Sequence, residues 1–170
     1  MSLKDEIALG VIEYYSQFPE FMRSDVLHTQ EVVSYTRLIA SGENLSERQV
    51  DLLEISAWLH DIGCPKSKCI YGNCLPKNQQ CVGEEVAKEF LEPFDGLTQE
   101  EKDWLANVVA THHKLDFAKS LNFMPLYEGD LIANILSGYF PRDKVPALFK
   151  TFVHTKTGKA LFKKIFKDLA

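Results

Sequence analysis

Two adjacent residues, His60 and Asp61, lie at the end of a strongly apolar segment and could together bind a metal ion. An imidazole and a carboxylate are costly to bury without partners, so something in the interior must satisfy them. Apolar residues of the preceding segment recur at helical spacing on more than one side, which predicts a helix enclosed by others. Because Gly63 and Pro65 end that helix, both side chains are expected to project inward from its last turn. Mixed nitrogen and oxygen ligands suit a divalent metal ion.

Other residues of metal-binding type lie on separate predicted helices. His28 precedes the His-Asp pair, Asp130 interrupts an apolar helix further along, and His112 and His113 lie between them. A His-Asp pair alone has a common explanation, a buried histidine with an ordinary hydrogen-bond partner. The order His28, His60, Asp61, Asp130 favours one shared ion over several independently satisfied polar groups in the core.

This order resembles the HD superfamily of metal-dependent phosphohydrolases, which is named after the His-Asp dipeptide. The resemblance covers roughly residues 24–140. The stretches Tyr-Gly-Asn-Cys at 71–74 and Glu-Gly-Asp-Leu-Ile-Ala-Asn at 128–134 look like those of small bacterial single-domain members. The resemblance implies an all-α, HD-domain-like helical bundle. It also implies, position by position, a metal-ligand set made of His28, His60, Asp61 and Asp130.

The expected cofactor is one divalent metal ion per chain, with Mn, Fe, Co, Ni, Zn and Mg all compatible with the ligands. Such an ion activates water and polarises a phosphoryl oxygen. Asp61 is expected both to bind the ion and to accept a proton from the attacking water. In the superfamily a His pair at the place of His112 and His113 binds a second metal or contacts the substrate phosphate. The alternative is a surface pair at a helix end, where the helix dipole favours it.

Two-metal members of the superfamily have a further histidine between the His-Asp turn and the His pair. This chain has no histidine between Ile62 and Thr111, although Glu84 or Glu85 could replace it. The sequence therefore predicts one metal. His112 and His113 are then expected to act as catalytic groups that stabilise developing charge or protonate a leaving oxygen.

Three basic side chains are candidates for binding the substrate phosphate. Lys66 and Lys68 follow the His-Asp turn closely, and Arg23 lies just ahead of the His28 helix. They would act as charged donors to phosphate oxygens. Lysines of this kind are more often simply solvated.

Four cysteines fall within 18 residues, at Cys64, Cys69, Cys74 and Cys81. They could bind zinc or an iron-sulfur cluster, although the paired spacing of most such sites is absent. The alternative is ordinary reduced cysteine. The N-terminus lacks a secretion signal, which predicts a cytoplasmic protein with reduced thiols.

The composition is that of an ordinary globular protein, with 45% hydrophobic and 25% charged residues. The length of 170 residues suits a single HD-type domain over residues 1–170, with the motif core at about 24–140 and C-terminal helices at 142–170 packed on it. Residues 142–170 carry eight Lys or Arg and two Asp, in a chain of net charge −5. The basic amphipathic segment 156–170 is expected to cover the protein's own core rather than a membrane. Residues 1–141 are therefore acidic, and this charge would repel nucleic acid.

Capping residues, apolar spacing and proline or glycine stops predict the elements that must position these residues. The predicted helices are at about 3–18, 24–40, 46–60, 83–93, 98–112, 126–139, 143–154 and 157–169. Ser24 is the expected N-cap of the second, and capping boxes at Ser46 and Thr98 open two others. Residues 63–83 are expected to form a long loop beside the site.

The first hypothesis is a phosphohydrolase that acts on a nucleotide or another small phosphate ester or anhydride through metal-activated water. The second is a non-catalytic regulatory module that binds a metal and a nucleotide. A two-iron oxygenase of the same fold would need histidine ligands that this chain lacks. Neither membrane nor nucleic acid is an expected partner, and a homo-oligomer is compatible with the sequence.

Overall fold

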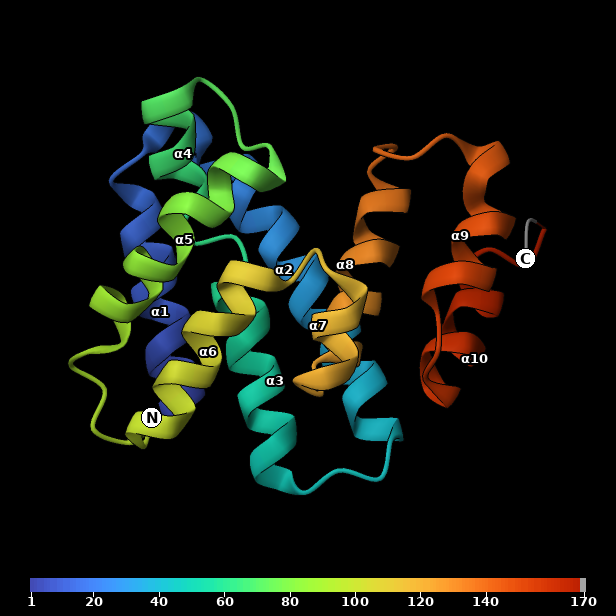
Figure 1. The fold of residues 1–170 in the computed structure, drawn as a ribbon, viewed down its shortest axis with the longest axis horizontal. Coiled ribbons are helices and arrows are strands. Elements are labelled where there is room, and N and C mark those ends of the chain that lie inside the picture. Colours follow the sequence, from blue (N-terminus) through green and yellow to red (C-terminus); the bar gives the residue numbers. More distant parts are fainter. Residues whose placement is uncertain (169–170) are drawn as a thin grey trace.

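The computed structural model describes residues 1–168, and no strand occurs among them, which confirms the all-α prediction. The chain runs from α1 at the N-terminal end to α10 near residue 165 (Figure 1). In order, its helices are α1 (Leu3–Ser16), α2 (Pro19–Gly42), α3 (Glu47–Leu59), α4 (Cys64–Tyr71), α5 (Pro76–Leu91), α6 (Gln99–Thr111), α7 (Leu115–Ser120), α8 (Met124–Leu136), the short 3-10 helix η1 (Arg142–Lys144), α9 (Val145–Phe152) and α10 (Lys156–Ile165).

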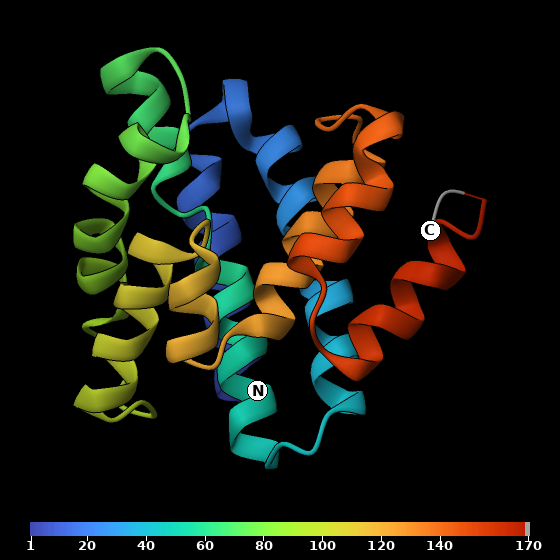
Figure 2. The ribbon, with the colours of Figure 1, turned by 45° about the vertical axis from the view of Figure 1, so that its right-hand side comes forward.

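Helix α3 lies at the centre and packs against α1, α2, α6 and α8 (Figures 1 and 2). Its two sides belong to different parts of the core. Ile55 and Leu59 pack in a cluster with α1, α5 and α6, whereas Leu53 and Ala57 pack in a second cluster with α2 and α8. This arrangement confirms the prediction that the helix before the His-Asp pair is enclosed, and it ends at Leu59 with His60 as its C-cap.

The capping signals gave the starts of α3 and α6 correctly, but not the start of α2. Ser46 accepts the Gln49 N–H, and Thr98 accepts the Glu101 N–H, as a capping box requires. Helix α2 begins at Pro19 instead of near Ser24. Proline suits the first helical turn because its missing N–H has no partner to lose there. Ser24 lies inside the helix, where its hydroxyl donates to the Phe21 carbonyl.

The prediction of a long loop at residues 63–83 is wrong, because two helices occupy most of that stretch. Pro65 and Pro76 lie in the first turns of α4 and α5, and Gly72 closes α4 with a left-handed φ of 72°. Residues that usually interrupt helices here mark the helix boundaries. The stretch between the predicted helices at 98–112 and 126–139, to which no helix was assigned, likewise contains α7.

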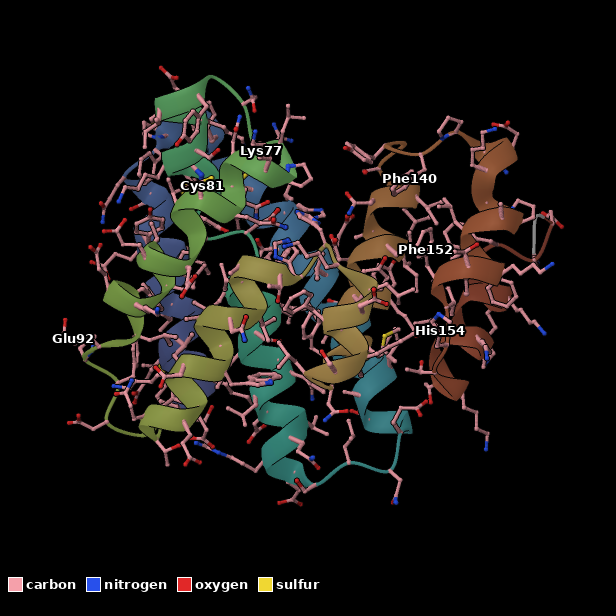
Figure 3. All side chains as sticks on the ribbon, viewed as in Figure 1. Lys77, Cys81, Glu92, Phe140, Phe152 and His154 are labelled. Carbon is pink, nitrogen blue, oxygen red and sulfur yellow. A yellow bond between two sulfur atoms is a disulfide. The ribbon has the colours of Figure 1, made fainter. Side chains whose placement is uncertain are left out.

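The prediction of four reduced cysteines is also wrong, because Cys64 and Cys74 form a disulfide. Helix α4 and its closing turn bring their Cα atoms to 5.3 Å, a separation that suits such a bond. Cys69 and Cys81 are free and exposed, and Cys81 lies on the outer side of α5 (Figure 3). A site made of four thiolates is therefore excluded.

We expect the Cys74→Ser substitution to lower the free energy of unfolding by about 2–3 kcal/mol, since the bond closes a short loop in the unfolded chain. Urea denaturation without reductant measures this difference. Cys69→Ser removes an exposed thiol from α4 without breaking the disulfide and is the matched control. Equal midpoints for the two variants would contradict the expectation.

Helices α9 and α10 form a layer beside α2 and α8 (Figures 1 and 2). Phe162 of α10 and Phe166, the C-cap of that helix, pack in a third apolar cluster with Ile39 and Ile132, so the basic segment covers the protein's own core. Not every apolar residue of α10 belongs to this covered face, since Ala160 is exposed. The predicted end of this helix, Leu169, lies outside the described residues.

The buried carboxylate of Glu128, on α8, fixes the start of α10. It accepts the backbone N–H groups of His154 and Thr155 at 2.6 and 2.8 Å and is also bonded to the Thr155 hydroxyl. His154 and Phe152 lie on this side of the molecule (Figure 3). Across residues 1–168 no ion pair joins the basic C-terminal segment to the acidic remainder; apolar packing and backbone bonds to carboxylates hold it instead.

None of the helices among the described residues is both long enough and apolar enough to cross a lipid bilayer.

Candidate metal centre

Four segments far apart in the sequence bring their ionisable side chains to one cavity of about 370 Å³. Helix α2 contributes His28, the turn after α3 contributes Asp61, the end of α6 contributes His112 and His113, and α8 contributes Asp130. The disulfide and several aromatic side chains form other parts of the wall. The remaining lining residues are Cys64, Cys74, Pro76, Gln79, Tyr127, Leu131, Asn134, Tyr139 and Phe140.

The first group at this cavity contains His28, His60 and Asp130, whose ligand atoms all lie within 4.8 Å of one another. His28 Nε2 is 3.3 Å from Asp130 Oδ1 and 3.4 Å from His60 Nε2. Ligands of one ion, each about 2.1 Å from it, lie about 3 Å apart at right angles. The three side chains therefore have the spacing of atoms that share a metal.

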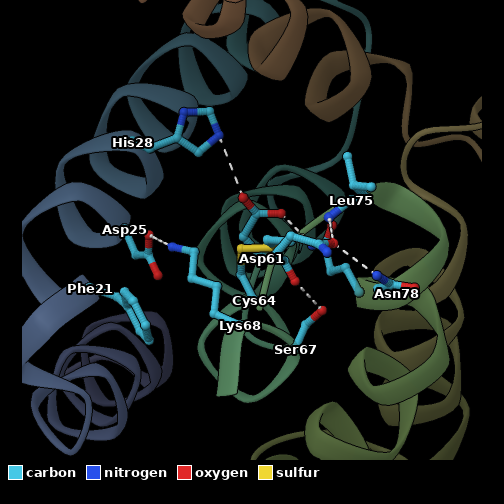
Figure 4. Close-up of a disulfide and its surroundings, with 12 residues drawn as sticks. Phe21, Asp25, His28, Asp61, Cys64, Ser67, Lys68, Leu75 and Asn78 are labelled. Carbon is cyan, nitrogen blue, oxygen red and sulfur yellow. Dashed lines mark hydrogen bonds and ion pairs between the residues drawn. A yellow bond between two sulfur atoms is a disulfide. The ribbon is translucent and has the colours of Figure 1, made fainter. Parts of the chain in front are cut away.

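Asp61 lies next to this group and forms a second group with His112 and His113. Its two oxygens face different partners. Oδ2 is 3.5 Å from His60 Nε2 and 3.7 Å from His28 Nε2 (Figure 4), whereas Oδ1 is 3.5 Å from His112 Nε2. The structure thus brings together all of the residues predicted from the sequence as metal ligands or catalytic groups.

The backbone sets the ring orientation and tautomer of two of the histidines. Nδ1 of His60 donates to the Ala57 carbonyl at 2.7 Å, and Nδ1 of His112 donates to the Val109 carbonyl at 2.9 Å. A carbonyl can only accept, so each Nδ1 carries the hydrogen and each Nε2 presents a lone pair in the neutral ring. Metal-binding histidines are usually oriented in this way.

The lone pair of His112 supplies a direct test of whether a cation fits here. Nε2 of His112 is buried and has no hydrogen-bond partner, although Asp61 lies nearby. A lone pair that faces a carboxylate is unfavourable unless a proton or a cation lies between them. The donor set therefore fits a positive ion.

The neighbouring carboxylates explain the titration of His28. Burial alone would lower the pKa of His28, but the hydrogen bond to Asp130 and the charge of Asp61 outweigh it and raise that pKa to about 9. Without a metal, His28 therefore carries a proton at neutral pH, and a bound ion must displace it.

The pKa values of His60, His113 and Asp61 are instead lowered. Burial lowers the pKa of His60, and burial together with the neighbouring His112 lowers the pKa of His113 to about 4. Burial would raise the pKa of Asp61, but the surrounding histidines hold it well below its usual range. At neutral pH Asp61 is therefore charged and the imidazoles of His60 and His113 are neutral, the states that bind metal ions.

Gln79 is a residue of the site that the sequence did not reveal. It lies on α5 with 1% exposure and contacts both Asp61 and His113. The stretch had been interpreted as a loop, and a single glutamine there carries no distinguishing pattern. Pro76, recognised as the first residue of a helix, would have placed Gln79 one turn inside it.

The three basic residues predicted to bind phosphate are not among those that line the cavity. Lys68 points to Asp25, at 2.6 Å, and lies over the Phe21 ring (Figure 4). Arg23 is exposed and Lys66 is partly exposed.

A profile of the HD domain matches residues 26–137, a range that contains every residue of the centre. Searches of curated proteins and of solved structures found no match.

Proposed function

The chain belongs to the HD domain family, and from this premise we propose that it is a metal-dependent phosphohydrolase that acts on a small phosphate ester. The observation that carries the proposal is the meeting of two imidazoles and two carboxylates, His28, His60, Asp61 and Asp130, at one cavity. These residues would hold a divalent ion. A bound ion would lower the pKa of a water molecule and polarise a phosphoryl oxygen of the substrate.

Asp61 is the proposed base. One of its oxygens faces the metal group, so the other can accept the proton of a water that attacks phosphorus. His112 and His113 line the cavity beside it. His112 is the proposed donor of a proton to the leaving oxygen, because burial alone would lower its pKa but the Asp61 carboxylate outweighs burial and raises it. His113, whose pKa is lowered to about 4, is neutral and would contact the phosphate. Nε2 of His112 lies 3.5 Å from Oδ1 of Asp61, the oxygen that does not face the metal group.

The lining of the cavity favours a phosphomonoester over a di- or triphosphate. Within residues 1–168 no lysine or arginine lines it, so histidines and the ion alone must balance the phosphate charge. Tyr127, Tyr139 and Phe140 offer an apolar wall to the rest of the molecule. The volume is that of a small-molecule site. Phosphate binding by Lys66, Lys68 and Arg23 stays a prediction, and Lys68 would first have to leave Asp25.

Steady-state assays with added Mn²⁺ test the proposal. Nucleoside monophosphates and p-nitrophenyl phosphate should be hydrolysed with higher kcat/KM than the matching nucleoside triphosphates. Tight nucleotide binding without turnover on any of these compounds would instead support the non-catalytic regulatory module.

Added Mn²⁺ should also raise the melting temperature. An ion at about 100 times its Kd stabilises the folded state by about 2.7 kcal/mol, or roughly 5–10 °C for a chain of this size. Differential scanning calorimetry measures the shift, and the titration gives the number of ions bound. His28→Ala should abolish the shift, whereas His154→Ala, which removes an exposed histidine, should retain it. An unchanged shift in His28→Ala would contradict the proposed ligand set.

A further inference from the structure

Gln79 links the proposed base, Asp61, to His113 through a single carboxamide. Its Nε2 donates to Asp61 Oδ1 in a short hydrogen bond and to the His60 carbonyl at 3.2 Å, while His113 Nε2 lies 3.0 Å from its Oε1. With 1% exposure, Gln79 has no room to exchange these partners for solvent.

The partners determine which way the amide points. A carboxylate and a carbonyl can only accept, so the NH₂ group must face Asp61 and His60, and the oxygen must face His113. His113 must then donate from Nε2, and its Nδ1 keeps the lone pair. One amide therefore specifies the tautomer of His113.

The hydrogen bond from Gln79 also orients the Asp61 carboxylate, because it engages only one of the two oxygens. Because Oδ1 is engaged by Gln79, the carboxylate cannot rotate freely, and Oδ2 stays directed at His28 and His60. A freely rotating carboxylate would have to be ordered again at every turnover.

Two features of the backbone hold Gln79 at this place. The turn after Asp61 touches α5 directly, since a Cβ on Gly63 would lie 2.6 Å from Gly83 Cα and 3.2 Å from the Gln79 carbonyl oxygen. In addition, the disulfide ties Cys74, just ahead of α5, to Cys64, just after the turn. Two separate contacts therefore hold the turn that carries Asp61 against the helix that carries Gln79.

We propose that Gln79 is a positioning residue that orients the Asp61 carboxylate toward the metal group and keeps the hydrogen of His113 on Nε2. This inference rests on the proposed function only for the expected change in kcat. The expected changes in the His113 ring and in Mn²⁺ affinity do not depend on that function. Removal of Gln79 should therefore alter metal affinity, turnover and the His113 ring, while substrate binding changes little.

The test compares Gln79→Leu, which removes all three contacts at similar size, with Gln79→Asn, which is one methylene too short to span Asp61 and His113. Gln80→Leu, a change to the neighbouring and more exposed glutamine, is the matched control. Circular dichroism and urea denaturation establish that each variant is folded. If Gln79→Leu does not fold, the polar variant Gln79→Asn supplies the same comparison.

Three measurements then follow on the folded proteins. In the metal-free wild type, ¹⁵N NMR of the histidine rings should show His113 protonated at Nε2, and this signature should be lost in the Gln79 variants. The Kd for Mn²⁺, from calorimetric titration, should rise about 10- to 100-fold. On the best phosphomonoester, kcat should fall about 10- to 100-fold with KM within about threefold.

An unchanged His113 signature together with an unchanged Mn²⁺ Kd in a folded Gln79 variant would overturn the proposal. So would equal losses in Gln80→Leu. A wild-type protein without phosphatase activity would refute the proposed function alone, because the ring signature and the Mn²⁺ affinity still decide the role of Gln79.

Discussion

The Asp61→Asn substitution should lower kcat at least about 10³-fold and leave the helices in place, since it removes a proposed base and a metal ligand at once. Asparagine has nearly the same shape, and its carbonyl oxygen can still accept the hydrogen bond from Gln79. What is lost is the negative charge that faces three imidazoles. Steady-state hydrolysis of a phosphomonoester with saturating Mn²⁺ measures the effect.

Asp116→Asn is the control for this substitution, because it makes the same chemical change at an exposed position of α7. It should retain the activity of the wild type. A folded Asp61→Asn protein with more than about a tenth of wild-type kcat would show that the carboxylate is not the base, since base catalysis supplies at least about 100-fold.

The Gly63→Ala substitution should cost both stability and activity. The new Cβ would overlap the backbone of Gly83 and Gln79, and backbone atoms cannot rotate away as a side chain can. Helix α5 must then move outward, at a cost of about 1–3 kcal/mol. Because Gln79 moves with it, kcat should fall about 10²-fold, the effect expected when a catalytic group shifts by about 1 Å.

Gly72→Ala offers a matched comparison at the other end of α4. Gly72 has a φ of 72° and no neighbour within 4 Å of an added Cβ. Alanine there should cost about 1–2 kcal/mol through backbone strain alone and leave kcat unchanged. Urea denaturation and the phosphatase assay separate the two cases. Equal kcat values for both variants would contradict the role given to the contact between Gly63 and Gly83.

The sequence predicted those parts of the fold that depend on local chemistry. The capping boxes at Ser46 and Thr98 need only residues three positions apart, and both were found. The order of His28, His60, Asp61 and Asp130 identified the family, which the HD domain match over residues 26–137 confirms. Their roles as metal ligands remain a prediction that the distances support.

The stretch after the His-Asp turn was missed because its helices depend on tertiary contacts. Pro65, Gly72 and Pro76 interrupt the apolar spacing, and α4 has only eight residues, too few to be stable alone. The packing of Gly63 on Gly83 and the bond between Cys64 and Cys74 stabilise this stretch, and both join segments whose proximity the sequence does not encode locally. The role of Gln79 could not be predicted for the same reason.

Glu128 and Asp130 are two positions apart on α8, one turned to the backbone of Thr155 and the other to His28. The HD domain match ends at residue 137, ahead of His154 and Thr155, to which Glu128 is hydrogen-bonded at the start of α10. A fragment that ends at residue 137 would leave the buried Glu128 carboxylate without these hydrogen-bond partners, two positions from the proposed metal ligand Asp130. The shortest fragment that folds should therefore extend beyond the HD domain match and include α10.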